Sequence, residues 1–326
     1  MWKTRVCDVL GIEYPILEGG MSMAGNPELA AAVSNAGALG MLGFNPGWVP
    51  PDQREGNLRN CIRRVKELTN KPFGVNIPIY AMRDEAVRLV ALALEEGVGI
   101  IASSGGNPSL FIHMIKEAGA KSIHVVSNVN QAQRAEQVGV DVVVAEGYEA
   151  GGANAPDELT TFVLVPCVVD SVNLPVVAAG GIADARGFVA ALALGAEGIQ
   201  MGTRFIATEE CHAHPNYKKA IVDAQDRDTV VTRRTLGLRI RSLKNDFVNR
   251  LVEMDQRGAA DEMRELIGPG RAREGQLLGD TENGEMSTGQ VAGTIKEILT
   301  AAEVINGILN GTESVVNRCV GLYKAQ

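Results

Sequence analysis

The chain has 326 residues, 45% of them hydrophobic, and a formal net charge of −8. This charge argues against a general affinity for nucleic acids or anionic membranes. No segment offers the roughly 20 uninterrupted apolar residues of a membrane span, and the N-terminal stretch lacks a signal-peptide core. The five cysteines form no CxxC pair, which disfavours a disulfide framework or structural zinc. We therefore expect a cytoplasmic protein that acts on a small-molecule substrate.

Short apolar runs alternate with longer amphipathic segments from the start of the chain to about residue 204. Because aromatic residues are only 4% of the chain, the core must consist of Ala, Val, Leu and Ile, which suits parallel strands covered by helices. We predict strands over residues 14–17, 39–42, 73–77, 99–103, 122–126, 140–145, 176–179 and 198–201. Helices are predicted between them, for example over 27–36, 84–96, 109–118, 131–138 and 185–194.

Eight strand–helix units in series predict a closed parallel (β/α)8 barrel of the TIM type over residues 1–208, since β-crossover-β connections are right-handed. An open doubly wound sheet is the alternative. It would usually carry its glycine-rich loop after the first strand, whereas here glycine loops follow several strands. The repeated loops favour the barrel.

The pattern changes after residue 204. Residues 209–275 are charged and helical in character, without recognisable strands, and we predict a helical cap subdomain over 209–280 that excludes water from a site below it. A helical decoration or an oligomer interface is the alternative. Residues 281–326 are predicted to form a turn-rich loop and a long helix that returns to the barrel. Apolar helix faces within 236–254 and 294–309 are compatible with a homodimer.

The loops after the first, third and sixth strands carry candidate binding residues, because functional loops of a barrel follow the C-terminal ends of its strands. Glycines let backbone approach a flat ligand, methionine offers soft apolar contact, and a carboxylate or amide supplies polar contacts. The candidates are Gly19, Gly20, Met21, Asn76, Glu146, Gly151 and Gly152. A tight turn at the glycines, and a structural cap at the asparagine, are equally compatible with these residues.

The loops after strands seven and eight predict a phosphate site. Gly180 and Gly181 expose backbone N–H groups at a helix start, and Gly202 with Thr203 add further donors beside them. Loops at these two strands are where many barrels bind phosphate. The two glycine loops together, at the expected strands, carry this prediction.

Histidine offers little further chemistry. His124 ends the fifth strand and either faces the site or caps the strand. The run Cys211-His212-Ala213-His214 has no accompanying ligand cluster, so we predict no metal site.

Six segments in chain order resemble the nitronate monooxygenase family: GGMSMAGNPELAAAVSNAGALGMLG, KPFGVNIP, AEGYEAGG, VVAAGGIADARGFVAALALGAEGIQMGTRFIAT, HPNYK and GDTENGEMSTGQVAGTI. This family includes the former 2-nitropropane dioxygenases, FabK-type enoyl-acyl carrier protein reductases and related NADH:quinone reductases. The resemblance implies an FMN-containing barrel with a helical second domain. It implies that the glycines and methionine of the first loop lie beside the isoalloxazine ring, with Asn76 near its polar edge. It also places the sixth-strand loop at the flank of the flavin, and Gly180, Gly181, Gly202 and Thr203 at its phosphate.

One position departs from the family pattern. Nitronate-oxidising members and many FabK-type members carry a histidine directly after two small residues, where this chain has Ala153. Alanine neither takes a proton nor donates a hydrogen bond. A lysine found in some members after strand five is also absent, since Val125 and Val126 follow His124.

These features predict an FMN-dependent oxidoreductase in which NADH or NADPH drives reduction of an activated C=C bond, as in an enoyl thioester, or of a quinone. The proton that the product needs would come from Tyr148, Asp157, Glu158 or water. Asp157 and Glu158 equally fit the N-terminus of the next helix. The alternatives are a nitronate monooxygenase, which can begin from an already ionised nitronate, and a flavin-binding protein without turnover.

Overall fold

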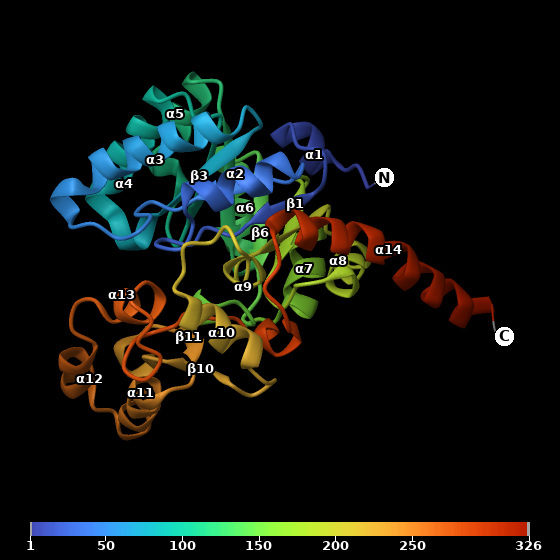
Figure 1. The fold of residues 1–326 in the computed structure, drawn as a ribbon. Helices are drawn as coiled ribbons and strands as arrows, with labels where there is room; N and C mark the ends of the chain where they lie inside the picture. The colour runs from blue at the N-terminus through green and yellow to red at the C-terminus, as the bar shows by residue number, and fades with distance from the viewer. Residues whose placement is uncertain (1, 325–326) are drawn as a thin grey trace.

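A computed structural model describes residues 2–324 and contains an eight-stranded parallel barrel surrounded by helices (Figure 1). The strands follow the order β1-β9-β8-β6-β5-β4-β3-β2. A parallel bridge between Leu17 and Leu39 joins the first strand to the second and closes the sheet. The eight strands are β1 Ile16–Glu18, β2 Gly40–Leu42, β3 Phe73–Pro78, β4 Ile100–Ser104, β5 Lys121–Val126, β6 Val142–Glu146, β8 Val176–Ala179 and β9 Gly198–Met201. The predicted barrel is confirmed, and the open sheet is excluded by the closure.

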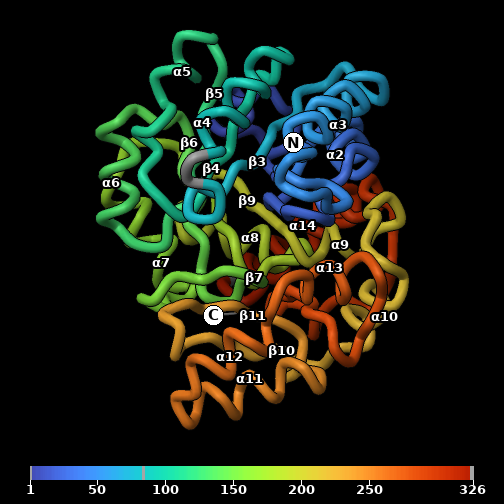
Figure 2. Tube along the Cα trace, turned by 90° about the vertical axis from the view of Figure 1, so that its left-hand side faces the viewer, coloured from blue at the N-terminus to red at the C-terminus, as the bar shows by residue number. Residues whose placement is uncertain are grey.

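Helices between successive strands cover the barrel from outside (Figures 1 and 2). They are α2 Pro27–Asn35, α3 Arg54–Leu68, α4 Ile79–Glu95, α5 Ile112–Glu117, α6 Val129–Val138, α7 Thr161–Val169 and α8 Ala185–Ala193. Helix α1 Arg5–Leu10 precedes β1 and packs against the inward-facing strand residues, and α9 Thr203–Ile206 follows β9. Helix α4 begins five residues before the predicted start, directly after Pro78. Helix α5 is preceded by a 3-10 turn over Pro108–Leu110.

The inside of the barrel is filled by small and branched side chains, because alternate residues of each strand point inward. The buried inner set includes Leu17, Leu39, Met41, Ala102, Ile123, Val142, Val144 and Val177. At the C-terminal ends of the strands this alternation turns polar side chains, among them Asn76 and Glu146, to the inner face. The barrel is therefore a packed core with a polar mouth.

The segment after the barrel is not wholly helical, which corrects the expectation of a cap without strands. Strands β10 Thr229–Thr232 and β11 Ile240–Leu243 form an antiparallel pair, and β11 also pairs with β7 Gly152–Ala153 from the sixth-strand loop. The third strand, β7, comes from about 90 residues earlier in the chain, so the pairing leaves no pattern in the local sequence. The segment is polar, and it forms strands because of this tertiary pairing. The helices of the cap are α10 Pro215–Asp223, α11 Asp246–Arg257, α12 Ala260–Ile267 and α13 Arg271–Gln276.

The C-terminal helix α14 Ala301–Lys324 packs against α8 and α2 of the barrel. Trp2 Nε1 donates a hydrogen bond to Thr312 Oγ1 at 3.1 Å, which ties the start of the chain to this helix. The far end of α14 extends beyond the barrel (Figure 1). Within residues 2–324, no helix combines the length and apolar character that crossing a membrane requires.

Candidate functional site at the barrel mouth

Asn76 lies at the mouth of the barrel, on β3 opposite Ala102. Asn76 is only 6% exposed, and its side-chain amide makes no hydrogen bond to another described residue. The first-strand loop lies directly against this amide, since a Cβ added at Gly20 would come within 2.1 Å of Asn76 Cγ. Buried amides are rarely left unpaired, so the donor and acceptor of Asn76 fit a polar ligand at the mouth.

Four backbone N–H groups meet at the ends of β8 and β9, which are neighbours in the sheet. Gly180 and Gly181 adopt φ values of +89° and +74°. Their N–H groups, and those of Gly202 and Thr203, make no hydrogen bond to a described residue. Asp184 caps the following helix α8 by accepting from Arg186 N at 2.8 Å, so the free donors belong to the two loops. Such a group of donors fits a phosphate.

The first-strand loop lies next to this donor group. Gly19 N donates to Met201 O at 2.8 Å, and a Cβ added at Gly19 would lie 3.3 Å from Gly202 Cα. The Met21 sulfur lies near the same glycine, at 3.8 Å from a Cβ added there. The structure therefore brings together the predicted residues of the first and eighth loops.

The sixth-strand loop is held under the cap. Ala153 pairs with Ile240 of β11, and a Cβ added at Gly151 would lie 2.6 Å from Gly289 N. Gly289 N in turn donates to Thr203 Oγ1 at 2.9 Å. A side chain at position 151 would therefore clash with the 287–290 segment, and glycine allows the two segments to pack closely.

Glu146 ends β6 opposite Ala179 and points into the mouth. It forms no ion pair with a described residue, and burial raises the pKa of its carboxyl to about 7. A carboxyl that keeps its proton near neutrality is typical of functional sites.

We expect Glu146→Gln to flatten the pH dependence of stability in the cofactor-free protein. The folded-state pKa lies above its ordinary value of 4.5, so the stability that this group contributes is present below that value. It is lost as the pH rises through about 7. Glutamine does not titrate, and the wild type should therefore lose roughly 1–3 kcal/mol more between pH 5 and pH 8 than the variant does.

Urea unfolding at the two pH values measures this difference. Glu117→Gln, which removes an exposed carboxylate, controls for the change in net charge. Equal losses of stability in the wild type and Glu146→Gln would contradict the expectation.

The predicted proton donors lie where the loop meets the cap. The Tyr148 hydroxyl accepts from Arg234 Nη2 at 2.6 Å, and Glu158 pairs with both Arg234 and Arg239. Tyr148 and Glu158 are thus brought together through one guanidinium, which leaves the carboxylate of Glu158 neutralised.

Asp157 lies apart from that pair, where it accepts from Asn128 Nδ2 at 2.7 Å. Helix α7 begins at Thr161 with Thr160 as its N-cap. Neither Asp157 nor Glu158 therefore caps it, and that interpretation is wrong.

Sequence reasoning missed three residues between the mouth and the cap. Arg233 Nη2 donates to both carboxylate oxygens of Glu285 at 2.8 Å, with side chains only 12% and 6% exposed. Tyr80, at the start of α4, interacts electrostatically with Glu146 and Arg233. A tyrosine directly after the third strand is a signal that could have been used. No local pattern distinguishes Arg233 or Glu285.

His124 does not reach the mouth. Its Nδ1 lies 2.8 Å from Ser103 Oγ, and it pairs with Val143, a residue of the outer core. Burial lowers the pKa of its imidazole to about 4. Elsewhere, Cys211 Sγ contacts Ala24 O at 3.6 Å and His212 lies 3.4 Å from Glu28.

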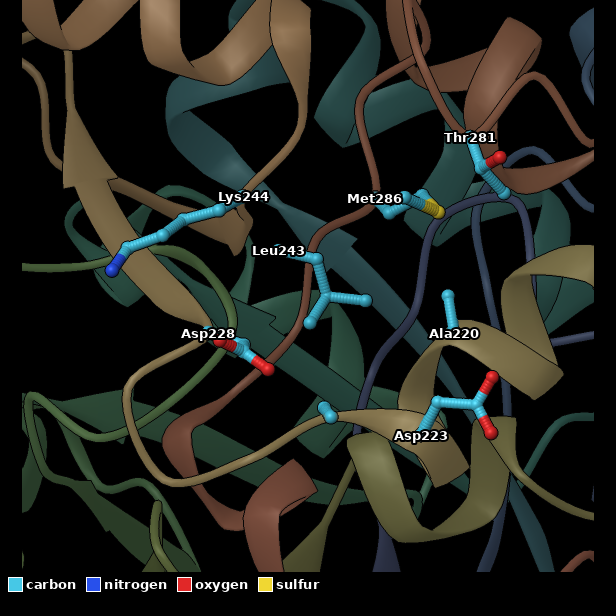
Figure 3. A pocket seen from close by; sticks show the side chains of 8 residues that line it. Ala220, Asp223, Asp228, Leu243, Lys244, Thr281 and Met286 are labelled. Atoms are coloured by element: carbon cyan, nitrogen blue, oxygen red, sulfur yellow. The ribbon is translucent and has the colours of Figure 1, made fainter.

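A separate hollow of about 390 Å³ lies in the cap (Figure 3). Its lining comes from α10, β11 and their connecting loops, and from the 281–286 segment. The lining residues are Ala220, Asp223, Ala224, Asp228, Leu243, Lys244, Thr281 and Met286. Because none of these belongs to a barrel strand, this hollow is not the site at the mouth.

A parallel barrel with polar loops at its mouth and a cap beside it defines an enzyme site of the TIM-barrel class. The family model described as nitronate monooxygenase matches residues 3–311, and the chain belongs to this family. It is similar to a probable nitronate monooxygenase of Staphylococcus saprophyticus, with 32% identity over 97% of this chain and 99% of the relative. The protein is an oxidoreductase of the nitronate monooxygenase and FabK type.

Two further relatives extend the comparison. The structure of FabK from Thermotoga maritima aligns with a TM-score of 0.91 and 45% identity, covering 99% of this chain and 100% of that one. A Rhodococcus jostii protein is 30% identical over 94% of this chain and 95% of the relative. It is named (3aS,4S,5R,7aS)-5-hydroxy-7a-methyl-1-oxo-octahydro-1H-indene-4-carboxyl-CoA dehydrogenase.

Proposed function

We propose that this protein is an FMN-dependent oxidoreductase that uses NADH or NADPH to reduce an activated C=C bond, as in an enoyl thioester, or a quinone. The group of free N–H donors at the ends of β8 and β9 carries this proposal, because it fits a phosphate beside an unpaired buried amide. The 45% identity to FabK over the whole chain favours the enoyl thioester. The Rhodococcus relative, which by its name acts on a coenzyme A thioester, supports the same substrate class.

Each part of the mouth has a role in holding FMN. The donors of Gly180, Gly181, Gly202 and Thr203 would bind the phosphate. The first-strand loop and Asn76 would contact the ring system, with Glu146, Gly151 and Gly152 at its flank. When bound, FMN takes two electrons from a nicotinamide and passes them to the acceptor. The protein supplies binding, orientation and exclusion of water by the cap.

Nitronate oxidation is the second candidate, favoured by the family model. Ala153 weakens it, because this side chain cannot abstract a proton from a nitroalkane. A nitronate that is already ionised needs no such base.

An anaerobic titration of the FMN-loaded protein with NADH and NADPH tests the proposal. We expect the visible flavin absorbance to bleach on addition of one of the nucleotides, and colour to return on addition of an enoyl thioester or a quinone. Bound flavin that neither nucleotide bleaches would overturn the reductase function and direct the work to nitronates under oxygen. A protein that cannot be loaded with FMN would overturn both functions.

A further inference from the structure

We infer that Tyr80 is the proton donor to the substrate carbon next to the thioester carbonyl, and that Arg233 is the positioning residue that stabilises the phenolate left behind. This inference rests on the proposed function and deepens its enoyl thioester branch. It assigns a catalytic role to a residue on the barrel rim, in place of the histidine that this chain lacks at Ala153.

Tyr80 stands at the rim of the mouth. It follows Pro78, the last residue of β3, and lies four positions after Asn76. Its ring covers the loop after the neighbouring strand β4, since a Cβ added at Gly105 would lie 2.3 Å from Tyr80 Cδ1. The residue is 52% exposed, so the phenol is open to a ligand while its ring is packed from below.

Charged groups face this phenol from both sides. Glu146 interacts with it from the barrel interior and Arg233 from the cap. The phenol after β3 is therefore coupled electrostatically to one group of the barrel mouth and to one group of the cap. A substrate bound over the mouth would therefore meet an exposed phenol at the end of β3.

The guanidinium of Arg233 is held by an ion pair, although the backbone of this residue is strained. It adopts φ +70°, a conformation that costs a non-glycine residue about 1–2 kcal/mol. Glu285 fixes its guanidinium at 2.8 Å, and Ser242 Oγ supports Glu285 at 3.3 Å. Its buried Nε still has no hydrogen-bond partner. A strained, largely buried arginine that keeps an unpaired donor and interacts electrostatically with an exposed phenol is an arrangement typical of functional sites.

The phenol is in the form that a donor needs. Partial burial of the half-exposed ring raises the pKa of Tyr80, Glu146 raises it further and Arg233 lowers it, and the net shift is upward from 10. Tyr80 thus carries its proton at neutral pH, and the adjacent guanidinium offsets the charge when the proton leaves.

The reaction balances with this assignment. Reduction of the C=C bond adds two electrons and one hydrogen at Cβ, which the reduced cofactor of the proposed function supplies. As the π bond breaks, Cα forms a bond to the proton of the Tyr80 hydroxyl. The tyrosinate then recovers a proton from water. The other predicted donors are less well placed, because Tyr148 and Glu158 are engaged by Arg234 and Asp157 by Asn128.

The test compares Tyr80→Phe with Tyr323→Phe, which removes an exposed phenol on α14, in the FMN-loaded enzyme. Stopped-flow absorbance follows reduction by nucleotide, then oxidation by crotonyl-coenzyme A or by ferricyanide, which takes electrons without a proton at carbon. We expect Tyr80→Phe to slow oxidation by the thioester at least ~100-fold. Its reduction by nucleotide and its oxidation by ferricyanide should stay within about 2-fold of the wild type. Tyr323→Phe should match the wild type in all three steps.

A second readout needs no turnover. In the cofactor-free protein, ultraviolet absorbance is followed against pH for the wild type and for Tyr80→Phe. The difference between the two titration curves reports the ionisation of the Tyr80 phenol alone. The double variant Arg233→Met/Glu285→Gln, which removes both charges together, should move that ionisation to higher pH.

The outcomes separate the two proposals. Thioester oxidation by Tyr80→Phe at the wild-type rate, or an unmoved ionisation in the double variant, overturns the role of Tyr80 and Arg233 and leaves the proposed function standing. A wild type that nucleotide reduces and no thioester reoxidises overturns the enoyl thioester function and this inference with it.

Discussion

Gly180→Ala is expected to remove FMN from the purified protein and to lower its free energy of unfolding by about 2–4 kcal/mol. Gly180 adopts φ +89°, where any other residue is strained. An added Cβ would also lie 2.7 Å from Gly147 O and 3.1 Å from Thr161 Oγ1. The loop must shift to relieve both contacts, and its N–H group would then leave the predicted phosphate position.

Gly56→Ala is the matched control for this substitution. Gly56 lies on the exposed face of α3, and an added Cβ there meets open space. Alanine should raise the free energy of unfolding by about 0.5–1 kcal/mol at this helical position and leave FMN bound. Flavin content after gel filtration and urea unfolding measure both effects. A Gly180→Ala protein that retains FMN at the wild-type ratio would contradict the phosphate site.

The barrel strands were predictable because each is a short apolar run bounded by turns, and all eight appear within a few residues of their predicted positions. Helix α3 fills a connection for which no helix range was predicted. Only Leu58, Ile62 and Val65 are buried in its 15 residues, so its apolar face is narrow. The hairpin of the cap was missed for another reason: Arg241 is buried at 4% exposure and donates to Tyr148 O at 3.0 Å. This partner is distant in sequence, so burial of the arginine cannot be read locally.

One part of the candidate site could likewise be predicted from the sequence, and another part could not. Loops at the ends of strands β1, β8 and β9 lie together because barrel topology places them at one end, and their glycines could be assigned from strand order alone. Tyr80 and Arg233 are 153 positions apart in the sequence, and they interact electrostatically only because the cap lies beside the mouth. Contacts between the barrel and the cap have no periodic sequence signal, so this part of the site required the structure.

Arg233→Met is expected to destabilise the protein by about 3–5 kcal/mol, although methionine suits the buried surroundings of the side chain. The change leaves the Glu285 carboxylate, 6% exposed, without its cation and with Ser242 Oγ as its remaining side-chain donor among the described residues. The cost therefore arises mainly from an uncompensated buried charge. Urea unfolding at pH 7 measures it.

The double variant Arg233→Met/Glu285→Leu separates that cost from the loss of packing. Replacing both partners removes the buried charge, so most of the lost stability should return, which gives a favourable coupling energy of about 2 kcal/mol or more in a double-mutant cycle. Additive losses would mean that the two side chains act independently and that the 2.8 Å pair contributes nothing to the fold. A favourable coupling energy, together with the expected shift of Tyr80 ionisation to higher pH when both charges are removed, would mean that the Arg233–Glu285 pair has two roles. It would stabilise the cap and also fix the cation that interacts with the phenol. The strained backbone of Arg233 would then be retained for the site, because stability alone is served equally by two apolar residues.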